Sequence, residues 1–469
     1  MKLFAGAVEL IGDLDSTERC EALIGLGEAQ LQTGDPTFRE TLLDAARSAS
    51  TLADAELAAE AALANNRGEV SSTFGGIDAE RVAAIERAIE LDEPPNRGRR
   101  ARLLALKALE LEWDADFGLR RALVEEAISL ARATGDARTL AEVLVKLEAI
   151  RAPDTLAWRM ELAPELLGCA ASVGDPALRY SAHNFDFHAC LERGDLERAK
   201  LGLEQQTLIA QELDRPTLNW FATFLRAGWE LMHGDLAAGE LSAERALQIG
   251  EEAGQPDAVF VYGAALLQAR NFQGRANEVI EMMEQSASAY PAIAAWRAAV
   301  AAALCYLDRG GEAEKILEEA AGDRFEHIAH NSAELTALAL YAEAAVLTAS
   351  PGPASILYEL IEPWTDQVVW NGVIGYGHNR MWLGLLAACM GDHEQADEHL
   401  AFACDFHEQN GLLLWAARAH LGWAQALAGR GDGARARDHA TRTLELSRKH
   451  GYGLFEPRAV TLLEARSTA

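Results

Sequence analysis

Three side chains in the middle of the sequence have the residue types and the spacing of a metal site. His183, Asp186 and Cys190 stand at positions i, i+3 and i+7, which places them on one face of a helix. Zinc takes imidazole, carboxylate and thiolate ligands. Phe185 and Phe187 lie among them, however, and this setting is more typical of packed interior side chains. We therefore interpret the three residues as structural.

A second group of histidines and cysteines occurs nearer the C-terminus. The intervals between its members are four, six, five and three residues, which is not a recognised zinc-ligand pattern. We interpret the group as surface histidines and buried thiols. Its members are Cys389, His393, His399, Cys404 and His407.

The sequence lacks complete motifs for nucleotide binding or hydrolysis. Gly25-x-Gly27 begins like a dinucleotide fingerprint, but the third glycine is missing and no strand is predicted before it. The chain has no Gly-x-x-x-x-Gly-Lys-Ser/Thr loop, no Gly-x-Ser-x-Gly elbow and no His-Glu-x-x-His helix. We expect no catalytic residue, no cofactor and no metal ligand, so the protein is not expected to be an enzyme.

Aromatic residues are the more informative candidates for binding. Ten tryptophans exceed what many alanine-rich helical repeats need. Most are expected to pack between helices, where aromatic side chains dominate burial. The remainder could line a concave groove, since tryptophan, tyrosine and arginine anchor many interfaces. The groove candidates are His183, Trp220, Arg226, Trp370, Tyr376, His378 and Arg380.

The elements that must position these residues are almost all helices. Apolar residues recur with helical spacing, and no segment shows the sustained alternation of a strand. Prolines at 176, 216 and 256 are forty residues apart, and Gly-Asp pairs at 194, 234, 391 and 431 mark turns with the same period. Glycine can end one helix in the left-handed conformation and aspartate can cap the next. This period predicts stacked helical pairs of tetratricopeptide type.

The predicted fold is an all-α, right-handed solenoid of roughly ten to eleven helical pairs. Residues 1–134 are expected to form degenerate repeats, and 135–312 regular repeats of about 40 residues. Residues 313–376 are expected to form an irregular repeat and an extended linker, and 377–469 the last repeats with a capping helix.

The net charge and the number of cysteines limit the classes of partner and the environment that we expect for the protein. There are 42 basic and 72 acidic residues among 469, a net charge of −30, which argues against a large nucleic-acid footprint. Six scattered cysteines are typical of a reduced environment. No signal-peptide core or membrane-spanning run is evident. We expect a cytoplasmic protein without direct nucleic-acid or membrane contacts.

Five stretches, in order along the chain, resemble the C-terminal helical-repeat region of large bacterial regulators. These regulators carry an AAA or STAND-type ATPase module, and often a nucleotide-cyclase domain or a LuxR-type helix-turn-helix. The stretches are APDTLAWR at 152–159, WFA at 220–222 with Arg226-Ala227, GQPDA at 254–258, ASILYELIEP at 354–363, and LGLLAA at 383–388 running into Gly391-Asp392.

The resemblance implies a sensor or interaction arm that regulates an ATPase switch. Its concave groove would bind a protein, a peptide or an effector, including an ATPase domain of the same polypeptide or operon. The family's catalytic residues cannot be assigned here, because they lie in domains that this sequence lacks. The alternative from the residues themselves is a small-molecule effector receptor with an aromatic-lined pocket.

Overall fold

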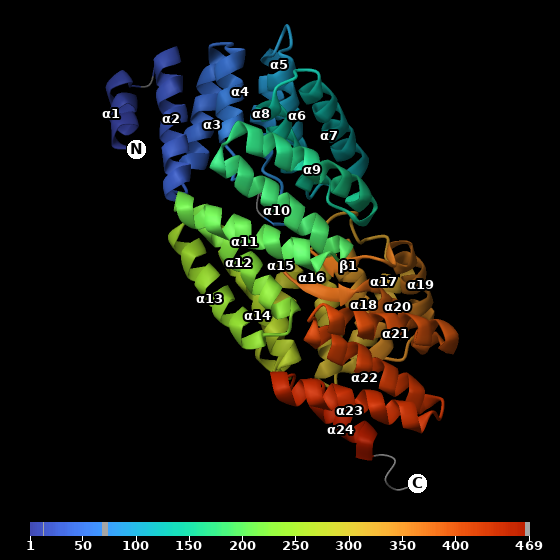
Figure 1. Ribbon diagram of the computed structural model, residues 1–469. Helices are drawn as coiled ribbons and strands as arrows, with labels where there is room; N and C mark the ends of the chain where they lie inside the picture. The colour runs from blue at the N-terminus through green and yellow to red at the C-terminus, as the bar shows by residue number, and fades with distance from the viewer. Residues whose placement is uncertain (13, 68–73, 465–469) are drawn as a thin grey trace.

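The computed structural model describes residues 1–12, 14–67 and 74–464. Within these residues the chain forms twenty-four α-helices, four short 3-10 helices and one two-stranded sheet (Figure 1). Consecutive helices pack against each other along most of the chain, so the predicted all-α solenoid is confirmed. Twenty-four helices correspond to twelve pairs, slightly more than predicted.

The first twelve helices are α1 (Lys2–Ile11), α2 (Thr17–Thr33), α3 (Phe38–Thr51), α4 (Ala55–Ala64), α5 (Ala79–Leu91), α6 (Arg97–Glu110), α7 (Phe117–Arg132), α8 (Ala137–Leu144), α9 (Leu156–Val173), α10 (Pro176–Arg193), α11 (Leu196–Leu213) and α12 (Pro216–Met232). The remaining twelve are α13 (Leu236–Glu252), α14 (Ala258–Phe272), α15 (Ile280–Ala289), α16 (Ala294–Tyr306), α17 (Gly310–Gly322), α18 (Glu334–Leu347), α19 (Pro351–Ile361), α20 (Asn379–Met390), α21 (His393–Gln409), α22 (Leu413–Gly429), α23 (Gly433–His450) and α24 (Glu456–Glu464). No helix of the described residues is long and apolar enough to cross a membrane.

The forty-residue period arises from local chemistry at the helix ends. Gly194 and Gly234 take positive φ values of 84° and 86°, which glycine adopts without strain. The aspartates that follow, Asp195 and Asp235, accept hydrogen bonds from backbone N–H groups in the first turns of α11 and α13. Inside the pair formed by α12 and α13, a Cβ on Gly239 would lie 2.5 Å from the Leu231 side chain. A small residue is therefore needed where the two helices approach.

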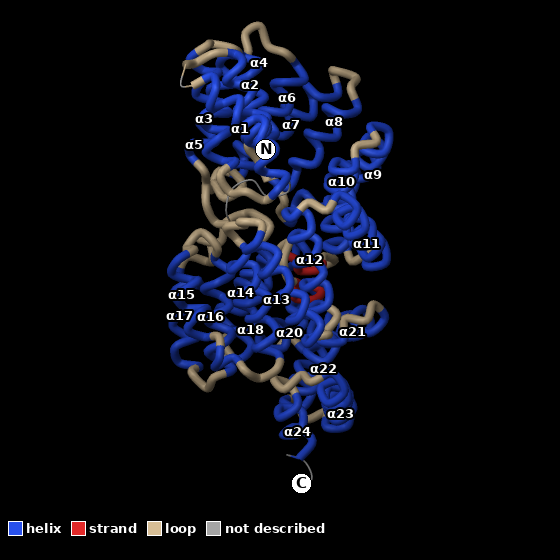
Figure 2. Tube along the Cα trace, turned by 90° about the vertical axis from the view of Figure 1, so that its left-hand side faces the viewer, coloured by secondary structure: helices blue, strands red, loops and turns tan. Residues whose placement is uncertain are grey.

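Successive turns of the solenoid touch one another. Figure 2 shows the first helices stacked above a second, larger group that contains both strands. The buried Arg67 forms an ion pair with the buried Asp257 at 2.7 Å, although the two residues are 190 positions apart. The Leu454 N–H donates to the Phe272 carbonyl oxygen at 3.1 Å. Successive turns of the superhelix are therefore in direct contact.

The residues before α20 form a buried β-hairpin. The sequence predicted an extended linker here and no strands, so this prediction was wrong. Strand β1 (Val368–Trp370) pairs antiparallel with β2 (Gly375–His378), and every residue of both strands is buried. The Asn371 side chain closes the turn by accepting from the N–H groups of residues 373 and 374 at 2.9 and 3.0 Å. Strands this short and buried on both faces show no polar alternation, which explains the failed prediction.

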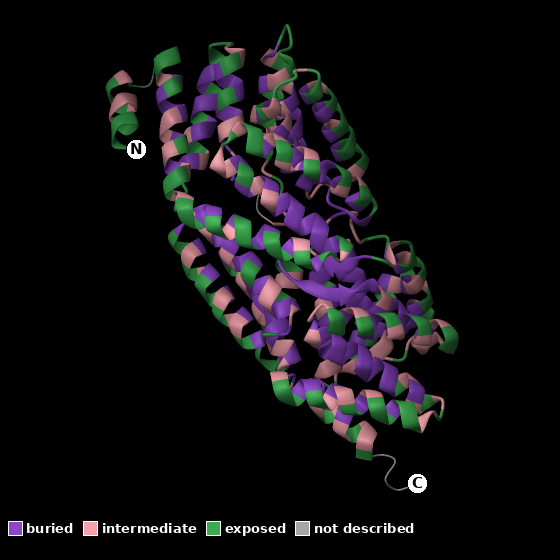
Figure 3. Ribbon diagram, in the orientation of Figure 1, coloured by how far each residue is buried: buried purple, intermediate pink, exposed green. Residues whose placement is uncertain are grey.

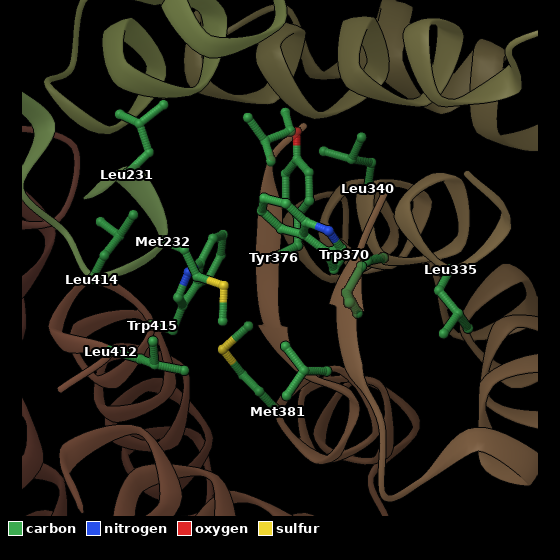
Figure 4. Packing of buried hydrophobic residues seen from close by; sticks show 14 of the residues in the cluster. Leu231, Met232, Leu335, Leu340, Trp370, Tyr376, Met381, Leu412, Leu414 and Trp415 are labelled. Atoms are coloured by element: carbon green, nitrogen blue, oxygen red, sulfur yellow. The ribbon is translucent and has the colours of Figure 1, made fainter. Parts of the chain in front are cut away.

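The hairpin lies at the centre of the largest hydrophobic cluster. It contacts α10, α12, α18, α20 and α21, and Figure 3 shows buried residues concentrated around it. Figure 4 shows the side chains that surround the strands, which come from α12, α18, α20 and the start of α22: Leu231, Met232, Leu335, Leu340, Met381, Leu412, Leu414 and Trp415. The hairpin thus occupies much of the interior of the superhelix, where an open concave groove was expected.

Candidate functional site

The predicted groove residues do not meet on one open surface. Trp370, Tyr376 and His378 belong to the hairpin and are 3%, 8% and 3% exposed. Trp220 is fully buried and packs against two phenylalanines of its own helix, α12. These four residues therefore form interior packing rather than a groove wall, because the closed superhelix and its hairpin leave them out of solvent.

The other three predicted residues lie apart from each other near the surface. His183 of α10 is half-buried, and burial lowers the pKa of its imidazole. Arg380 places its guanidinium 4.5 Å from the Phe402 ring centre and 3.3 Å from a carboxylate oxygen of Asp366. Arg226 is exposed and lines a polar cleft between α11, α12 and α13, whose volume is about 790 Å³.

Neutral histidines anchor the hairpin to the helices. The Trp370 indole N–H donates to Nδ1 of His188 in α10 at 2.8 Å. The backbone N–H of His378 donates to Nε2 of His407 in α21 at 3.0 Å. Burial holds the pKa of both His188 and His407 well below its ordinary value, so both imidazoles are neutral and can accept.

Two further bonds join the hairpin to the first half of the chain. A guanidinium N–H of Arg151 donates to the Asn371 carbonyl oxygen at 2.6 Å, at the hairpin turn. The Gln367 side-chain amide donates to the Pro153 carbonyl oxygen at 2.8 Å, just before β1. The hairpin therefore bridges the segment after α8 and the C-terminal helices.

One side of the hairpin forms part of the wall of a partly open cavity. The cavity lies between β2 and helices α14, α16, α18, α20 and α22, and two aromatic residues from the first half of the chain complete it. Its space is about 90 Å³, measured by the centres of water-sized spheres. A single water needs roughly 10–15 Å³ on this scale and a cavity of about 150 Å³ binds benzene, so this cavity has room for several water molecules or for a ligand smaller than benzene. The aromatic residues of its wall are Phe74, Trp113, Phe260, Phe272, Trp296, Tyr306, Tyr376, Trp382 and Trp415.

The residues from the first half of the chain are held by contacts across the superhelix. The Phe74 N–H donates to a carboxylate oxygen of Asp257 at 3.1 Å. The Phe74 ring stacks on Phe260 with centroids 5.3 Å apart and meets Trp113 edge-on at 6.3 Å. Phe74, Trp113 and Phe260 are only half-buried, so this aromatic trio is the most accessible part of the wall.

A buried ion pair forms another part of the cavity wall. Arg418 of α22 donates through Nε to both carboxylate oxygens of Glu343 in α18, at 3.0 and 3.1 Å. The Tyr306 hydroxyl also donates to Glu343. Burial and the Glu343 charge raise the Tyr306 pKa well above its ordinary value, so the phenol stays protonated. The arrangement brings two charges into the interior with no net charge.

Several polar atoms of the wall are buried without a hydrogen-bond partner among the described residues. Such atoms are rare in folded proteins and each calls for an explanation. They are Gln268 Oε1, Asn271 Oδ1, Trp296 Nε1, Thr336 Oγ1, Trp415 Nε1 and Arg418 Nη1. The Gln268 amide orientation is fixed, because its Nε2 donates to the Gly375 carbonyl oxygen at 2.7 Å and leaves Oε1 as an acceptor.

The histidine and cysteine groups singled out in the sequence have other partners. Asp186 is bonded to Arg198, with Nε to Oδ2 at 3.1 Å, and the Cys190 thiol lies 3.6 Å from Oδ1 of Asp186. The His399 Nε2 lies 3.2 Å from the Tyr358 hydroxyl. In the described part of the chain, no three His, Cys, Asp or Glu side chains gather in a way that could hold a metal ion.

Sequence reasoning missed the polar residues of the cavity. A signal was present, because Gln268, Glu343 and Arg418 each lie within a run of apolar residues on a helix. An isolated polar side chain on the inward face of such a helix is buried, and it therefore needs a hydrogen-bond partner. No local sequence signal indicated that residues 74 and 113 line the cavity, because their position there depends on how the turns of the superhelix pack together.

Comparisons with known proteins give little further information. No family model matches the sequence, and no curated protein matches it. Among solved structures, the chain is similar to one described as Naa15/Naa10 bound to HypK-THB, with 13% sequence identity. The match covers 95% of this chain and 66% of that chain, with a TM-score of 0.23. A likeness this weak carries no argument about function.

Proposed function

We propose that this protein is a non-catalytic sensor module that binds a small molecule in the partly open cavity beside the hairpin. The observation that carries the proposal is the aromatic wall of the cavity, which also includes the polar side chains of Gln268, Thr336 and Arg418. Ligand sites are typically concave and mostly apolar, with a few polar groups that fix orientation. A cavity with polar groups in its wall is not expected to stay empty, since dry voids are lined by apolar groups alone.

The hairpin gives such a site a route to the rest of the molecule. Its residues 373, 374 and 376 line the cavity, while its turn and Trp370 bond to the segment after α8 and to α10. A ligand that contacts the hairpin would favour one of its positions and so shift the packing of the two halves. This coupling would make the module a sensor rather than a storage site.

A thermal-shift screen of the purified chain against uncharged small molecules tests the proposal. Ala302→Leu places a larger side chain in the cavity wall and is expected to abolish the shifts, whereas Ala237→Leu on the exposed face of α13 leaves them unchanged. Ligands that raise the melting temperature equally in all three proteins would bind elsewhere and would refute the proposed site.

The target of the signal is proposed from the sequence. The stretches at 152–159, 254–258 and 354–363 support a regulatory arm of a signalling ATPase or a transcriptional regulator. An ATPase or DNA-binding domain encoded in the same frame or operon would support this part of the proposal. Neighbouring genes without such a domain would count against it.

A second candidate function is direct binding of a protein or peptide at the polar cleft between α11 and α13. Arg226 and Arg245 line this cleft together with hydroxyl and amide side chains, and its volume of about 790 Å³ is large enough for a peptide segment. Affinity capture with the wild-type chain and with Arg226→Glu tests it. A partner retained equally by both would exclude the cleft.

A further inference from the structure

We infer that the cleft between α11, α12 and α13 binds an extended peptide segment of a partner protein, with an acidic and a basic side chain about three residues apart. This assignment rests on the second candidate function, which places a peptide in the cleft. It does not involve the cavity beside the hairpin.

Two arginines of the cleft wall have no counter-charge in their own chain. Arg226 of α12 and Arg245 of α13 both line the cleft, and both side chains are exposed. Within the described residues neither guanidinium forms an ion pair, whereas Arg198 of the neighbouring α11 pairs with Asp186. The chain has 72 acidic against 42 basic residues, so carboxylates are abundant. The two arginines are therefore free to bind an anionic group of a ligand.

The packing of α12 against α13 brings these two arginines together. Figure 1 shows α11, α12 and α13 side by side. A Cβ on Gly239 would lie 2.5 Å from the Leu231 side chain. A Cβ on Gly250 would lie 2.8 Å from Nε1 of Trp220. These two contacts define the antiparallel register, which sets residues 226 and 245 at the same level on adjacent helices.

Two carboxylates line the opposite end of the cleft. Asp214 follows α11 directly and Glu252 is the last residue of α13, and both are exposed. Neither forms an ion pair within the part of the chain that the structure describes. Glu252 lies seven residues beyond Arg245 on the same helix, which is two turns or about 10.5 Å. The cleft therefore has a positive end and a negative end.

The distance between the two ends sets the length of the ligand. An extended chain advances about 3.3–3.6 Å per residue and a polyproline II helix about 3.1 Å, so three residues span the separation. The polyproline II helix also has three residues per turn, so side chains three positions apart point the same way. A free amino acid with a neutral side chain holds both of its charges on one carbon and cannot reach both ends.

Other polar side chains of the cleft suit a peptide backbone. Gln211 is exposed, and its amide makes no hydrogen bond to other described residues. The Thr223 hydroxyl donates to the Asn219 carbonyl oxygen at 2.6 Å, and the Ser242 hydroxyl donates to Glu230 at 2.5 Å. Both hydroxyl oxygens can still accept a hydrogen bond. An extended segment has no internal hydrogen bonds, so its N–H and C=O groups can pair with such side chains.

Surface plasmon resonance with the immobilised full chain and short peptides tests the inference. The reference probe is acetyl-Ser-Glu-Ala-Pro-Lys-Ser-amide, in which glutamate and lysine are three positions apart. Four companion probes replace glutamate by glutamine, replace lysine by glutamine, place lysine next to glutamate, or replace glutamate by phosphoserine. We expect the reference probe to bind at least about threefold more tightly than each of the first three companions.

Three variants assign each peptide charge to one end of the cleft. Arg226→Gln and Arg245→Gln should each weaken the reference probe about three- to tenfold and leave the probe without glutamate unchanged. Glu252→Gln should weaken only the probes that contain lysine, by about threefold. The control Arg437→Gln removes an exposed charge from α23, away from the cleft, and should change no affinity. None of the three cleft variants removes an ion pair from the described fold, so their melting temperatures should match the wild type.

The outcomes separate the two proposals for the cleft. If no probe binds at about 1 mM, the cleft is not a peptide site, and the second candidate function fails together with the inference. If a glutamine probe or the probe with adjacent charges binds as tightly as the reference probe, the cleft binds peptides but the inferred charge pattern is wrong.

Two further results would also overturn the inference. If the phosphoserine probe binds more than about tenfold more tightly than the reference probe, the occupant is a phosphopeptide and not a segment with an acidic side chain. If Arg226→Gln and Arg245→Gln both bind the reference probe as the wild type does, the arginines do not contact the ligand.

Discussion

The packing of the hairpin against α12 predicts the effect of Gly228→Ala. A Cβ at position 228 would lie 1.9 Å from the Val373 carbonyl oxygen and 2.8 Å from the Trp370 ring. The nearer atom belongs to the backbone of the hairpin turn, so the hairpin or the helix must shift. Overpacking of a core in this way costs about 1–3 kcal/mol, and the severe overlap places this case at the upper end. Alanine recovers about 1 kcal/mol through its higher helix propensity. We expect a net destabilisation of about 2 kcal/mol.

A matched variant separates packing from propensity. Gly168 lies in α9, is exposed, and a Cβ there would have no neighbour within 4 Å. Gly168→Ala should therefore stabilise the protein by about 0.5–1 kcal/mol. Urea unfolding followed by far-ultraviolet circular dichroism measures both changes. A Gly228→Ala protein as stable as the wild type, alongside a stabilised Gly168→Ala protein, would refute the buried position of the hairpin.

Three further predictions concern individual polar and charged side chains. Glu343→Gln should destabilise the protein by about 3–5 kcal/mol, because Arg418 loses its buried counter-charge; a loss below about 1 kcal/mol in urea unfolding would mean that the pair is solvated. Burial raises the pKa of Glu112 to about 7, above the ordinary 4.5. Its contribution to the stability of the fold is therefore complete below pH 4.5 and is lost as the pH rises through 7. The loss is about 3 kcal/mol at most, and Glu112→Gln should flatten the stability profile over this window; an identical profile in the variant would exclude this group. Trp370→Phe should cost about 2–3 kcal/mol in thermal unfolding, since it shrinks a buried ring and leaves Nδ1 of His188 without its donor; an unchanged melting temperature would contradict that contact.

The regular repeats could be predicted from the sequence because their determinants are local. Glycine at 194, 234, 391 and 431 ends a helix, the following aspartate caps the next one, and the forty-residue spacing sets the stacking. Each of these interactions spans only a few residues. The order of the helices from α10 to α14 and from α20 to α24 follows from them.

The hairpin and the cavity could not be predicted in the same way. Strands of three and four residues that are buried on both faces look like a short apolar linker in the sequence. They are too short to show either the helical or the strand spacing of apolar residues. The cavity needs Phe74 to stack on Phe260 across the superhelix, a contact between residues 186 positions apart, and Trp113 to pack against Phe74. The aromatic content predicts an open groove that includes Trp370 and Tyr376, whereas the structure buries both, because the contacts between turns of the superhelix have no sequence signature.

A crystal structure of the chain soaked with the compound that gives the largest thermal shift tests the central claim most directly. We predict density for this compound inside the cavity, beside the hairpin and between α14, α16, α18 and α22. Density at the cleft beside Arg226, or ordered water alone in the cavity of a crystal soaked at saturating ligand, would contradict the claim that this cavity is the site where the protein senses a small molecule.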